Sequence, residues 1–305
     1  MHKALVIFLA AYFTVNLGVA DWHYPNELPN GVLSDDEDWG GMCSSGKRQS
    51  PVDLAKDAAI KGEFPLFDFE SYKSVMKNPL IVNNGHSIQI SSVPGPIYIS
   101  GGGLNSVYIF DQMHFHWSSE HTIDHKRFAL ELHIVHHDKR YDTLSRAAQE
   151  KNGIAVVGIL YKITTIPNPF IEKLLENSKN IFDAAGKNVT FQDKLVLYDL
   201  LPRNKQRYFR YEGSLTTPSC GEAVIWTVFE DAIGITIEQL ERFKSVHDDS
   251  GHELTHNYRH IQPLNSRALI YVEGEYNPNS ANSFKSFSAS ILIISVIFAF
   301  IGMKI

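Results

Sequence analysis

Cysteine is scarce in this chain. Its 305 residues include only Cys43 and Cys220, and neither belongs to a Cys-x-x-Cys pair. Zinc coordination by thiolates is therefore disfavoured, because such sites are built from closely spaced cysteines. The two residues remain either as a disulfide, which an even count favours in a secreted protein, or as two free buried thiols.

Concentrated positive charge is also missing. No run of lysine and arginine occurs, and the formal net charge is -6 with an isoelectric point of about 6.1. We therefore expect no nucleic-acid partner, and mild acidity favours solubility more than any one ligand. Internal repeats, low-complexity tracts and a linker that would split the chain are absent too, which favours a single domain.

Long apolar runs occur only at the two ends. Lys3, the apolar residues 5–13 and the small residues 18–20 predict a signal peptide over residues 1–20, which leaves Asp21 as the mature N-terminus. A buried N-terminal helix is the alternative. The sequon that begins at Asn188 is then a candidate glycosylation site, although a bare sequon often stays unmodified.

The C-terminal apolar run, residues 289–303, is shorter than the ~20 residues of a spanning helix. Small polar residues precede it, so residues 279–305 match a signal for attachment of a glycosylphosphatidylinositol (GPI) anchor, which removes the tail. Candidate attachment residues are Asn279, Ser280 and Asn282. Residues 21–278 would then form a domain held by lipid at the extracellular face of the plasma membrane. A single-span anchor and an ordinary buried segment are the alternatives.

The remaining residues predict a mainly β domain. Strand-like runs separated by Gly, Pro and Asn clusters cover residues 80–82, 87–91, 97–100, 112–117, 128–136, 154–163 and 224–228. Helical patterns are fewer. One covers residues 169–178, and the other covers residues 236–246, where Thr236 can cap the first turn. The fold class is α+β with strands dominant and short surface helices.

Histidines are dense in two of these strands. Side chains alternate faces along a strand, so His114 and His116 share one face, and His133 shares a face with Glu131 and Val135. If the two strands pair, three imidazoles converge. Three imidazoles with an open fourth position are the usual arrangement of catalytic zinc, which lowers the pKa of a bound water and supplies hydroxide near neutral pH. One Zn²⁺ per chain is predicted.

Two polar residues are placed to support these ligands. Gln112 precedes His114 by two residues and Glu131 precedes His133 by two, each on the same face. A metal-bound imidazole needs its second nitrogen held by such a partner. The alternative is that these histidines are hydrogen-bonded core residues, which is the commoner role of a histidine in an apolar strand.

Dispersed motifs over residues 22–272 resemble the α-class carbonic anhydrases, most of all their extracellular membrane-anchored members. The motifs keep the family order and include GKRQSPVDL, NNGH, QMHFHWSSEH, ELHIVH, NGIAVVGI, GSLTTP and NYRHIQPLNSR. The resemblance implies one domain around a large, mostly antiparallel twisted sheet, and reversible hydration of carbon dioxide to bicarbonate and a proton. It also implies sulfonamide-type inhibitors and a monomer or dimer.

The resemblance also implies individual roles. The three histidines would be the zinc ligands. The Thr216 hydroxyl would accept a hydrogen bond from zinc-bound hydroxide and donate one to Glu120, which a group with one proton can do only if its partner is an ionised carboxylate. His86 would shuttle protons, because an exposed imidazole titrates near pH 6.5. Without the resemblance, each would be an ordinary turn, surface acid or loop histidine.

Other residues complete the implied site. The backbone carbonyl of Asn257 would hold a ligand histidine. The residues that would order a chain of water are Tyr24, Asn84 and Gln89. The residues that would line the carbon dioxide pocket, with Thr216, are Val135, Val156, Leu215, Thr217, Val224 and Trp226.

The cysteines fall where extracellular members carry a disulfide, so the resemblance favours a Cys43–Cys220 bridge that steadies the Thr216 loop. Three positions depart from the family pattern: Ser118, Ser219 and Asp111, the last a carboxylate at a pocket rim that is usually apolar. None removes a catalytic group.

Two alternative functions are less favoured by the sequence. One is a ligand-binding ectodomain that has lost zinc, which the intact histidine triad with Glu120, Thr216 and His86 opposes. The other is a zinc esterase acting on a larger substrate, and ester hydrolysis is better regarded as a side activity of the same hydroxide.

Overall fold

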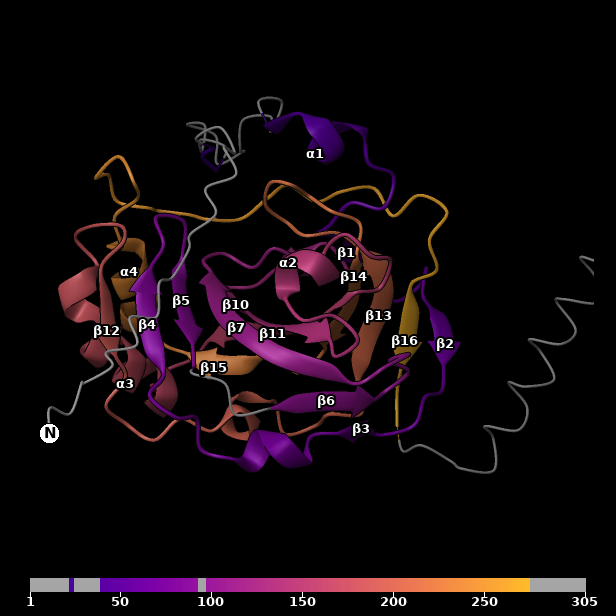
Figure 1. Ribbon diagram of the computed structural model, residues 1–305, viewed down its shortest axis with the longest axis horizontal. Coiled ribbons are helices and arrows are strands. Elements are labelled where there is room, and N and C mark those ends of the chain that lie inside the picture. The colour runs from indigo at the N-terminus through magenta and orange to yellow at the C-terminus, as the bar shows by residue number, and fades with distance from the viewer. Residues whose placement is uncertain (1–21, 25–38, 93–96, 275–305) are drawn as a thin grey trace, which may run out of the picture.

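The computed structural model describes residues 22–24, 39–92 and 97–274. A mixed sheet of thirteen strands dominates this part of the chain (Figure 1). Its main path runs β12-β4-β5-β7-β10-β11-β14-β13-β16-β2, with β15 beside β11, and β6 beside β7 and β3. A separate small sheet has the order β1-β8-β9.

The strands of the described residues have the following bounds. The large sheet comprises β2 (Ile60–Gly62), β3 (Phe67–Asp68), β4 (Leu80–Asn83), β5 (Ile88–Ser91), β6 (Tyr98–Gly101), β7 (Tyr108–His116), β10 (Leu130–Asp138), β11 (Ile154–Ile163), β12 (Asn188–Thr190), β13 (Tyr208–Gly213), β14 (Val224–Phe229), β15 (Ile233–Ile235) and β16 (Ile270–Val272). The small sheet comprises β1 (Asp53–Leu54), β8 (Thr122–Ile123) and β9 (Lys126–Arg127).

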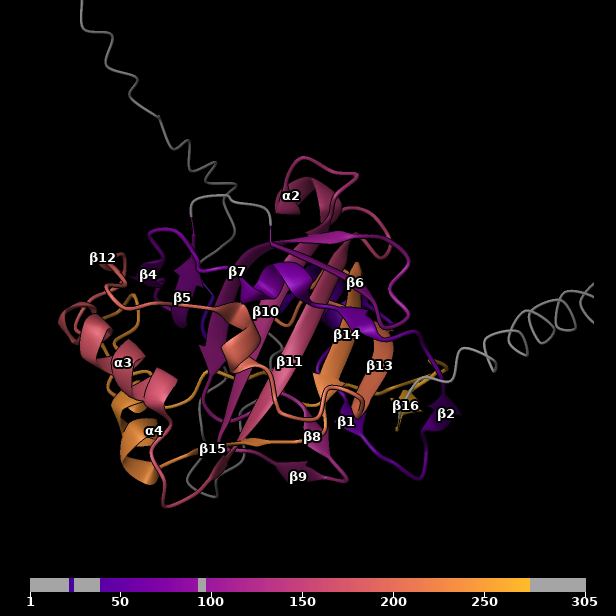
Figure 2. The same ribbon diagram turned by 90° about the horizontal axis from the view of Figure 1, so that it is seen from below.

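The expected mainly β, mostly antiparallel sheet with few short helices is confirmed. In the large sheet only β11 with β14, β11 with β15, and β16 with β2 pair in parallel among the described strands. Figure 2 shows β7, β10, β11, β14 and β13 side by side through the middle of the molecule. The longest strands, β7, β10 and β11, are therefore central, and they carry the predicted histidines.

Helices are short and few in the described residues. They are α1 (Gly41–Ser45), α2 (Leu144–Ala147), α3 (Pro169–Ser178) and α4 (Ile237–Lys244), with 3-10 turns η2 (Glu70–Lys73), η3 (Lys179–Ile181) and η4 (Leu197–Leu200). The prediction for residues 169–178 is confirmed, and Asn168 caps that helix. Thr236 caps α4 through a reciprocal pair with Gln239, as its place before the apolar pattern predicts. Figure 1 shows α3 and α4 together at the end of the sheet formed by β12 and β4.

The bounds of most predicted strands differ from the prediction, by one or two residues in β4, β5, β6, β10 and β14 and by four at the start of β7. The strand β7 begins at Tyr108, before the predicted residues 112–117, because a bulge between Val135 and His136 lets its pairing with β10 continue. Trp117 lies outside β7 because its backbone N–H donates to Oδ1 of Asn257 at 2.6 Å instead of to a strand. The alternation that defines the histidine faces is unaffected.

The strand β13 was missed because Arg210 and Glu212 interrupt its apolar pattern. Arg210 is nevertheless buried. The sheet separates two apolar cores. One contains Trp117, Phe229 and most of the large side chains, and the other, on the histidine face, includes Val135 and Trp226.

Asp138, at the end of β10, gives a prediction on acid stability. Its fully buried carboxylate accepts hydrogen bonds from Nη2 and Nε of Arg140 at 2.6 and 2.9 Å and from Oγ of Ser106 at 2.9 Å. Burial alone would raise the pKa of Asp138, but these bonds outweigh it and lower that pKa. The stabilisation is therefore present above the unfolded pKa of about 3.9 and is lost as the pH falls through the folded value.

We expect Asp138→Asn to lower the free energy of unfolding at pH 7 by about 1.5–3 kcal/mol, the range for hydrogen bonds to charged groups. Urea unfolding at pH values from 7 to 3 measures this, and the loss relative to the parent should shrink below pH 4. Asp183→Asn is the matched control, because its pair with Lys187 is exposed and should contribute little. Equal losses in the two variants would contradict the prediction.

No helix in the described ranges is long and apolar enough to cross a membrane. The predicted signal peptide over residues 1–20 and the predicted attachment residues Asn279, Ser280 and Asn282 lie outside the described residues.

Candidate metal centre

The predicted histidines meet across paired strands. On the antiparallel strands β7 and β10, His114 lies directly opposite His133, and His116 lies opposite Glu131. On the next strand, β5, Gln89 lies opposite His114. One nitrogen from each of His114, His116 and His133 falls within 4.8 Å of the others. The alternation of side chains along β7 and β10 thus brings all three imidazoles together, as the sequence predicts.

Each imidazole is held through its outer nitrogen. Nδ1 of His114 lies 2.9 Å from Oε1 of Gln112, and Nδ1 of His116 lies 2.7 Å from the backbone oxygen of Asn257. Nε2 of His133 lies 2.9 Å from Oε1 of Glu131. The nitrogens left for a shared ligand are therefore Nε2 of His114, Nε2 of His116 and Nδ1 of His133.

This donor set fits zinc. Nε2 of His116 and Oε2 of Glu120 are buried and have no hydrogen-bond partner among the described residues, although buried polar atoms are costly to leave unsatisfied. Burial, joined by the neighbouring histidines, lowers the pKa of His114 and of His116. Their imidazoles are therefore neutral, which is the form that binds a metal.

Glu131 makes several hydrogen bonds on the face of the sheet that carries the three histidines. Its Oε2 accepts the backbone N–H groups of Glu120 and His121, each at 2.8 Å, and its Oε1 contacts His133 and Nδ1 of His121, the latter at 2.7 Å. Burial alone would raise the pKa of Glu131, but His121 and His133 lower it well below its usual range. Nε2 of His121 continues to the Tyr211 hydroxyl at 2.6 Å.

The sequence did not reveal the role of His121. It also groups with Glu131 and His133 as a second set of possible metal donors, but hydrogen bonds already connect these three side chains. The sequence feature that could have indicated this role is the position of His121 in the motif QMHFHWSSEH, one residue after Glu120.

Glu120 is buried and contacts the histidines. Its Oε2 lies 3.6 Å from Nε2 of His116 and 3.9 Å from Nδ1 of His133. Its Oε1 accepts the backbone N–H of Arg259 at 3.0 Å. Among the described residues, the expected hydrogen bond from Thr216 to Glu120 is not formed, although the Thr216 side chain is buried. Arg259 was not predicted as a partner, because it lies far away in the sequence.

The Cys43–Cys220 disulfide is formed, with Cα atoms 5.0 Å apart. It fixes one end of the loop between β13 and β14. Within that loop the N–H of Cys220 donates to the oxygen of Thr217 at 2.8 Å, and the N–H of Leu215 donates to the oxygen of Gly221 at 3.0 Å. The backbone hydrogen bonds therefore close the loop that contains Thr216, and the bridge ties this loop to α1.

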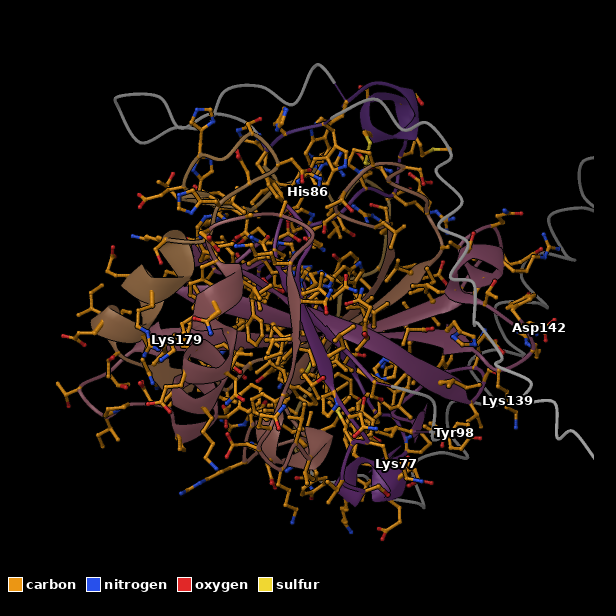
Figure 3. All side chains as sticks on the ribbon, turned by 60° about the vertical axis from the view of Figure 1, so that its left-hand side comes forward. Lys77, His86, Tyr98, Lys139, Asp142 and Lys179 are labelled. Atoms are coloured by element: carbon orange, nitrogen blue, oxygen red, sulfur yellow. A yellow bond between two sulfur atoms is a disulfide. The ribbon has the colours of Figure 1, made fainter. Side chains whose placement is uncertain are left out.

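His86 lies in the β4–β5 loop, near the surface (Figure 3). Its ring stacks on Trp22 at 3.9 Å between centroids, and its Nε2 lies 3.8 Å from Oδ2 of Asp249. Asn84 shapes this loop: its Oδ1 accepts the backbone N–H of His86, and its Nδ2 donates to Gln89 at 3.3 Å. Tyr24 is buried beside the loop and lines, with His86, a pocket of about 380 Å³.

The predicted pocket residues gather on the histidine face. Val135, Val156 and Trp226 lie in register across β10, β11 and β14, and the Trp226 ring is 4.8 Å from that of His133. Val224 belongs to the same apolar cluster and Leu215 packs against it. Thr217 is half-buried in the loop.

Asp111, which the resemblance places at the pocket rim, contacts a histidine. Its Oδ2 lies 2.7 Å from Nδ1 of His137. Burial raises the pKa of Asp111, and the bond from His137 opposes that rise.

A prediction concerns Gln112. Gln112→Ala removes the acceptor on Nδ1 of His114, and loss of such a support typically costs about 10–100-fold in metal affinity. Competition with a chelator for zinc measures the affinity. Gln149→Ala, whose amide accepts from an exposed arginine, is the control and should leave the affinity unchanged. Unaltered affinity in Gln112→Ala would contradict the prediction.

Comparison with known proteins identifies the family of this single-domain β protein, which has three converging imidazoles on its central strands. The family profile for eukaryotic-type carbonic anhydrases matches residues 34–273. Carbonic anhydrase 4 of Rattus norvegicus is 35% identical over 88% of this chain and 90% of its own length. Carbonic anhydrase 6 of Homo sapiens is 32% identical over 88% and 89%, and carbonic anhydrase 12 of Homo sapiens is 34% identical over 74% and 67%.

The chain belongs to the carbonic anhydrase family, and it is an enzyme of that family. The resemblance inferred from dispersed motifs is confirmed.

Proposed function

We propose that this protein is a zinc enzyme that hydrates carbon dioxide reversibly, with His114, His116 and His133 as the metal ligands. One observation carries the proposal: one nitrogen from each of the three imidazoles converges within 4.8 Å, and Nε2 of His116 is buried without a hydrogen-bond partner among the described residues. When bound, zinc would lower the pKa of a coordinated water so that hydroxide forms near neutral pH.

The chain's own residues would orient the reaction. Glu120 has an acceptor oxygen beside the histidines that no donor occupies among the described residues. In the reacting enzyme the buried Thr216 hydroxyl would donate its one proton to this oxygen and keep its lone pairs for the attacking group. Val135, Val156 and Trp226 provide an apolar wall on the same face, which suits an uncharged substrate. Gln112, Glu131 and Asn257 hold the ligand rings in place.

The proton must leave the site after each turnover. We propose His86 as the shuttle, with water ordered by Tyr24, Asn84 and Gln89. The support is its place in a loop that is pinned by Asn84 and opens to a surface pocket. Asp249, 3.8 Å from Nε2 of His86, can stabilise the protonated ring.

His86→Ala should lower the maximal rate of hydration at low buffer concentration by up to about 100-fold, the lower end of the range for a positioned proton-transfer group. Stopped-flow hydration measures the rate, and added imidazole buffer should restore much of it. His125→Ala is the control, since His125 is exposed and pairs with Asp53. A rate that is unchanged, or that imidazole does not rescue, would contradict the shuttle role.

We further propose secretion after removal of residues 1–20, a GPI anchor at Asn279, Ser280 or Asn282, and a glycan at Asn188. Support for the glycan comes from its exposed position in β12, at the edge of the sheet. Release from cells by a phosphatidylinositol-specific phospholipase tests the anchor. Retention on the membrane after that treatment would favour a single-span anchor.

The test of the function is stopped-flow hydration of carbon dioxide by residues 21–280, with zinc measured on the same sample. Near-stoichiometric zinc with fast hydration supports the proposal. A folded protein without zinc would favour a ligand-binding module, and full zinc without hydration would indicate a blocked pocket. Ester hydrolysis, if present, should be lost with the same variants, because it would use the same hydroxide.

A further inference from the structure

Arg210 of β13 is buried on the sheet face opposite the histidines. It lies in register with Thr227 of β14, so both side chains leave the sheet on one side. Trp226, the next residue on β14, points to the other side and contacts His133. Arg210 is only 5% exposed. Its environment is therefore separate from the metal centre.

The guanidinium of Arg210 lacks a carboxylate partner. Its Nη2 donates to the oxygen of Gly102 and to Oγ1 of Thr227, both at 2.8 Å. Its Nε is buried without a hydrogen bond, and no ion pair involves Arg210 among the described residues. Burial lowers the pKa of Arg210 to about 10, so the group stays cationic at neutral pH. A buried cation left uncompensated is strongly destabilising.

Aromatic rings surround the guanidinium on its closed sides. Phe64, Phe67 and Tyr208 lie with ring centroids 5.6–5.8 Å from the guanidinium carbon. Gly102 and Gly103 have positive φ, and a Cβ at either would collide with the Phe67 or Phe64 ring. The loop after β6 thus leaves room for the two rings, which pack against Arg210.

Arg210 lines a pocket of about 410 Å³. Arg267 lines the same pocket, and its three hydrogen bonds go to the backbone oxygens of Pro263, Leu264 and Glu212. The one carboxylate in the lining, Glu212, is already bonded to Arg48 and Lys151. Two guanidinium groups therefore face one pocket with no carboxylate of their own.

The rest of the lining is apolar or amide except Tyr211, whose hydroxyl lies 2.6 Å from Nε2 of His121. Phe64, Ile225, Ala268 and Ile270 supply hydrocarbon surface, and Asn105 and Asn152 supply amides. A volume of about 300–1,000 Å³ with mainly apolar walls and a few converging polar groups is typical of sites for small molecules. The planar guanidinium matches a carboxylate with two parallel hydrogen bonds.

We infer that this pocket binds a small organic carboxylate, with its oxygens toward Arg210 and Arg267 and its hydrocarbon part against Phe64, Ile225 and Ile270. Arg210 leaves the sheet on the face away from the metal centre, and Tyr211, from the other face, also lines the pocket. The inference does not rest on the proposed zinc chemistry, since no ligand histidine lines the pocket.

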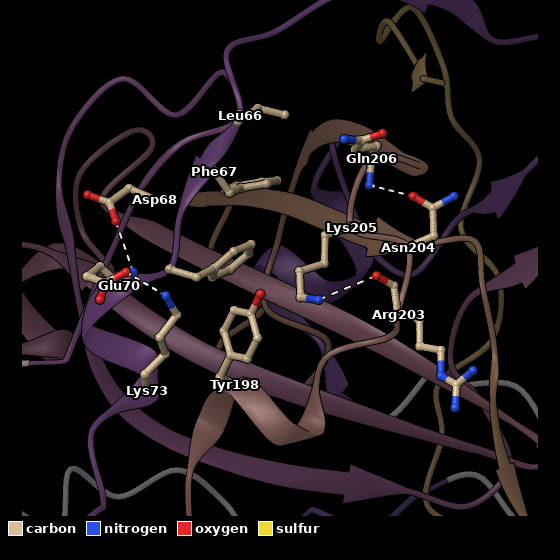
Figure 4. A pocket seen from close by; sticks show the side chains of 11 residues that line it. Leu66, Phe67, Asp68, Glu70, Lys73, Tyr198, Arg203, Asn204, Lys205 and Gln206 are labelled. Atoms are coloured by element: carbon tan, nitrogen blue, oxygen red, sulfur yellow. Dashed lines mark hydrogen bonds and ion pairs between the residues drawn. The ribbon is translucent and has the colours of Figure 1, made fainter. Parts of the chain in front are cut away.

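A larger pocket nearby gives weaker evidence of anion binding. The pocket in Figure 4, of about 530 Å³, is lined by Lys73, Arg203 and Lys205. Lys73 is half-exposed and pairs with Glu70, and Lys205 lies over the Tyr198 ring at 4.6 Å. Cations that water already solvates need no ligand, so the buried Arg210 is the stronger indication.

The test uses 4-fluorobenzoate as the probe and ¹⁹F NMR as the readout, on the zinc-loaded protein with a saturating sulfonamide. The sulfonamide closes the histidine site, so carboxylate bound there is not counted. The expected result is a saturable change in the probe signal of the parent protein. Arg210→Gln should weaken that binding at least tenfold, and Ala268→Phe, which fills the pocket and keeps Arg210, should do the same.

Two controls keep the outcome decisive. Arg203→Gln, in the pocket of Figure 4, should leave the affinity unchanged. Hydration of carbon dioxide should persist in every variant, which also shows that each is folded; if Arg210→Gln does not fold, Ala268→Phe decides. No saturable binding by the parent, or equal binding by parent and Ala268→Phe, would overturn the inference whatever the activity proves to be.

Discussion

His133→Ala is expected to abolish zinc binding and hydration of carbon dioxide together. In the proposed site His133 would supply Nδ1 to the metal, and its Nε2 lies 2.9 Å from Oε1 of Glu131. Its removal leaves two imidazoles, which cannot complete the three-ligand site of a catalytic zinc. Zinc content by mass spectrometry should fall to background, and the stopped-flow rate should fall to that of the uncatalysed reaction.

The matched control for this variant is His136→Gln. His136 is on the same strand, but it is directed into the opposite core, where Nε2 contacts the Tyr72 hydroxyl at 2.5 Å and Nδ1 contacts the oxygen of Ala155 at 3.0 Å. Some loss of stability is expected there, with zinc and activity retained. Full zinc occupancy in His133→Ala, or equal loss of zinc in both variants, would contradict the assignment of His133.

The second large effect is expected from the disulfide. Cys43 and Cys220 are 177 residues apart in the sequence, and closing so long a loop stabilises by about 5 kcal/mol in the chain-entropy model. We expect the double substitution Cys43→Ala with Cys220→Ala to lower the free energy of unfolding by about 2–5 kcal/mol, the range for native disulfides of secreted domains. Urea unfolding with both proteins at pH 7 measures this loss.

The reductant provides the control for the disulfide. Reduction should shift the unfolding curve of the parent toward that of the double variant and leave the double variant unchanged. Turnover should also fall, because the loop with Thr216 loses its covalent link to α1. Two results together would contradict the account: a parent unfolding curve that does not shift with reductant, and a double variant as stable as the parent.

Local alternation is what made the metal centre predictable. The faces of β7 and β10 follow from period two alone, so His114, His116 and His133 could be grouped from spacing, with Gln112 and Glu131 as their supports. Helix α3 was equally local: the pattern of residues 169–178 gave its bounds.

Hydrogen-bond partners that lie in loops distant in the sequence were harder to predict. The acceptor for His116 is Asn257, which only the family resemblance indicated, and the donor to Glu120 is the backbone of Arg259, which nothing in the local sequence indicated. The strand β13 was missed because a buried arginine breaks its apolar alternation. Side chains whose role depends on contacts across more than a hundred residues leave no periodic signal.

The most direct test of the central claim is a zinc titration of the metal-free enzyme, with hydration of carbon dioxide measured at each addition. The account predicts a rate that rises linearly and stops at one zinc per chain, because the described residues bring His114, His116 and His133 to a single point. A folded protein whose hydration rate does not depend on added zinc would contradict it.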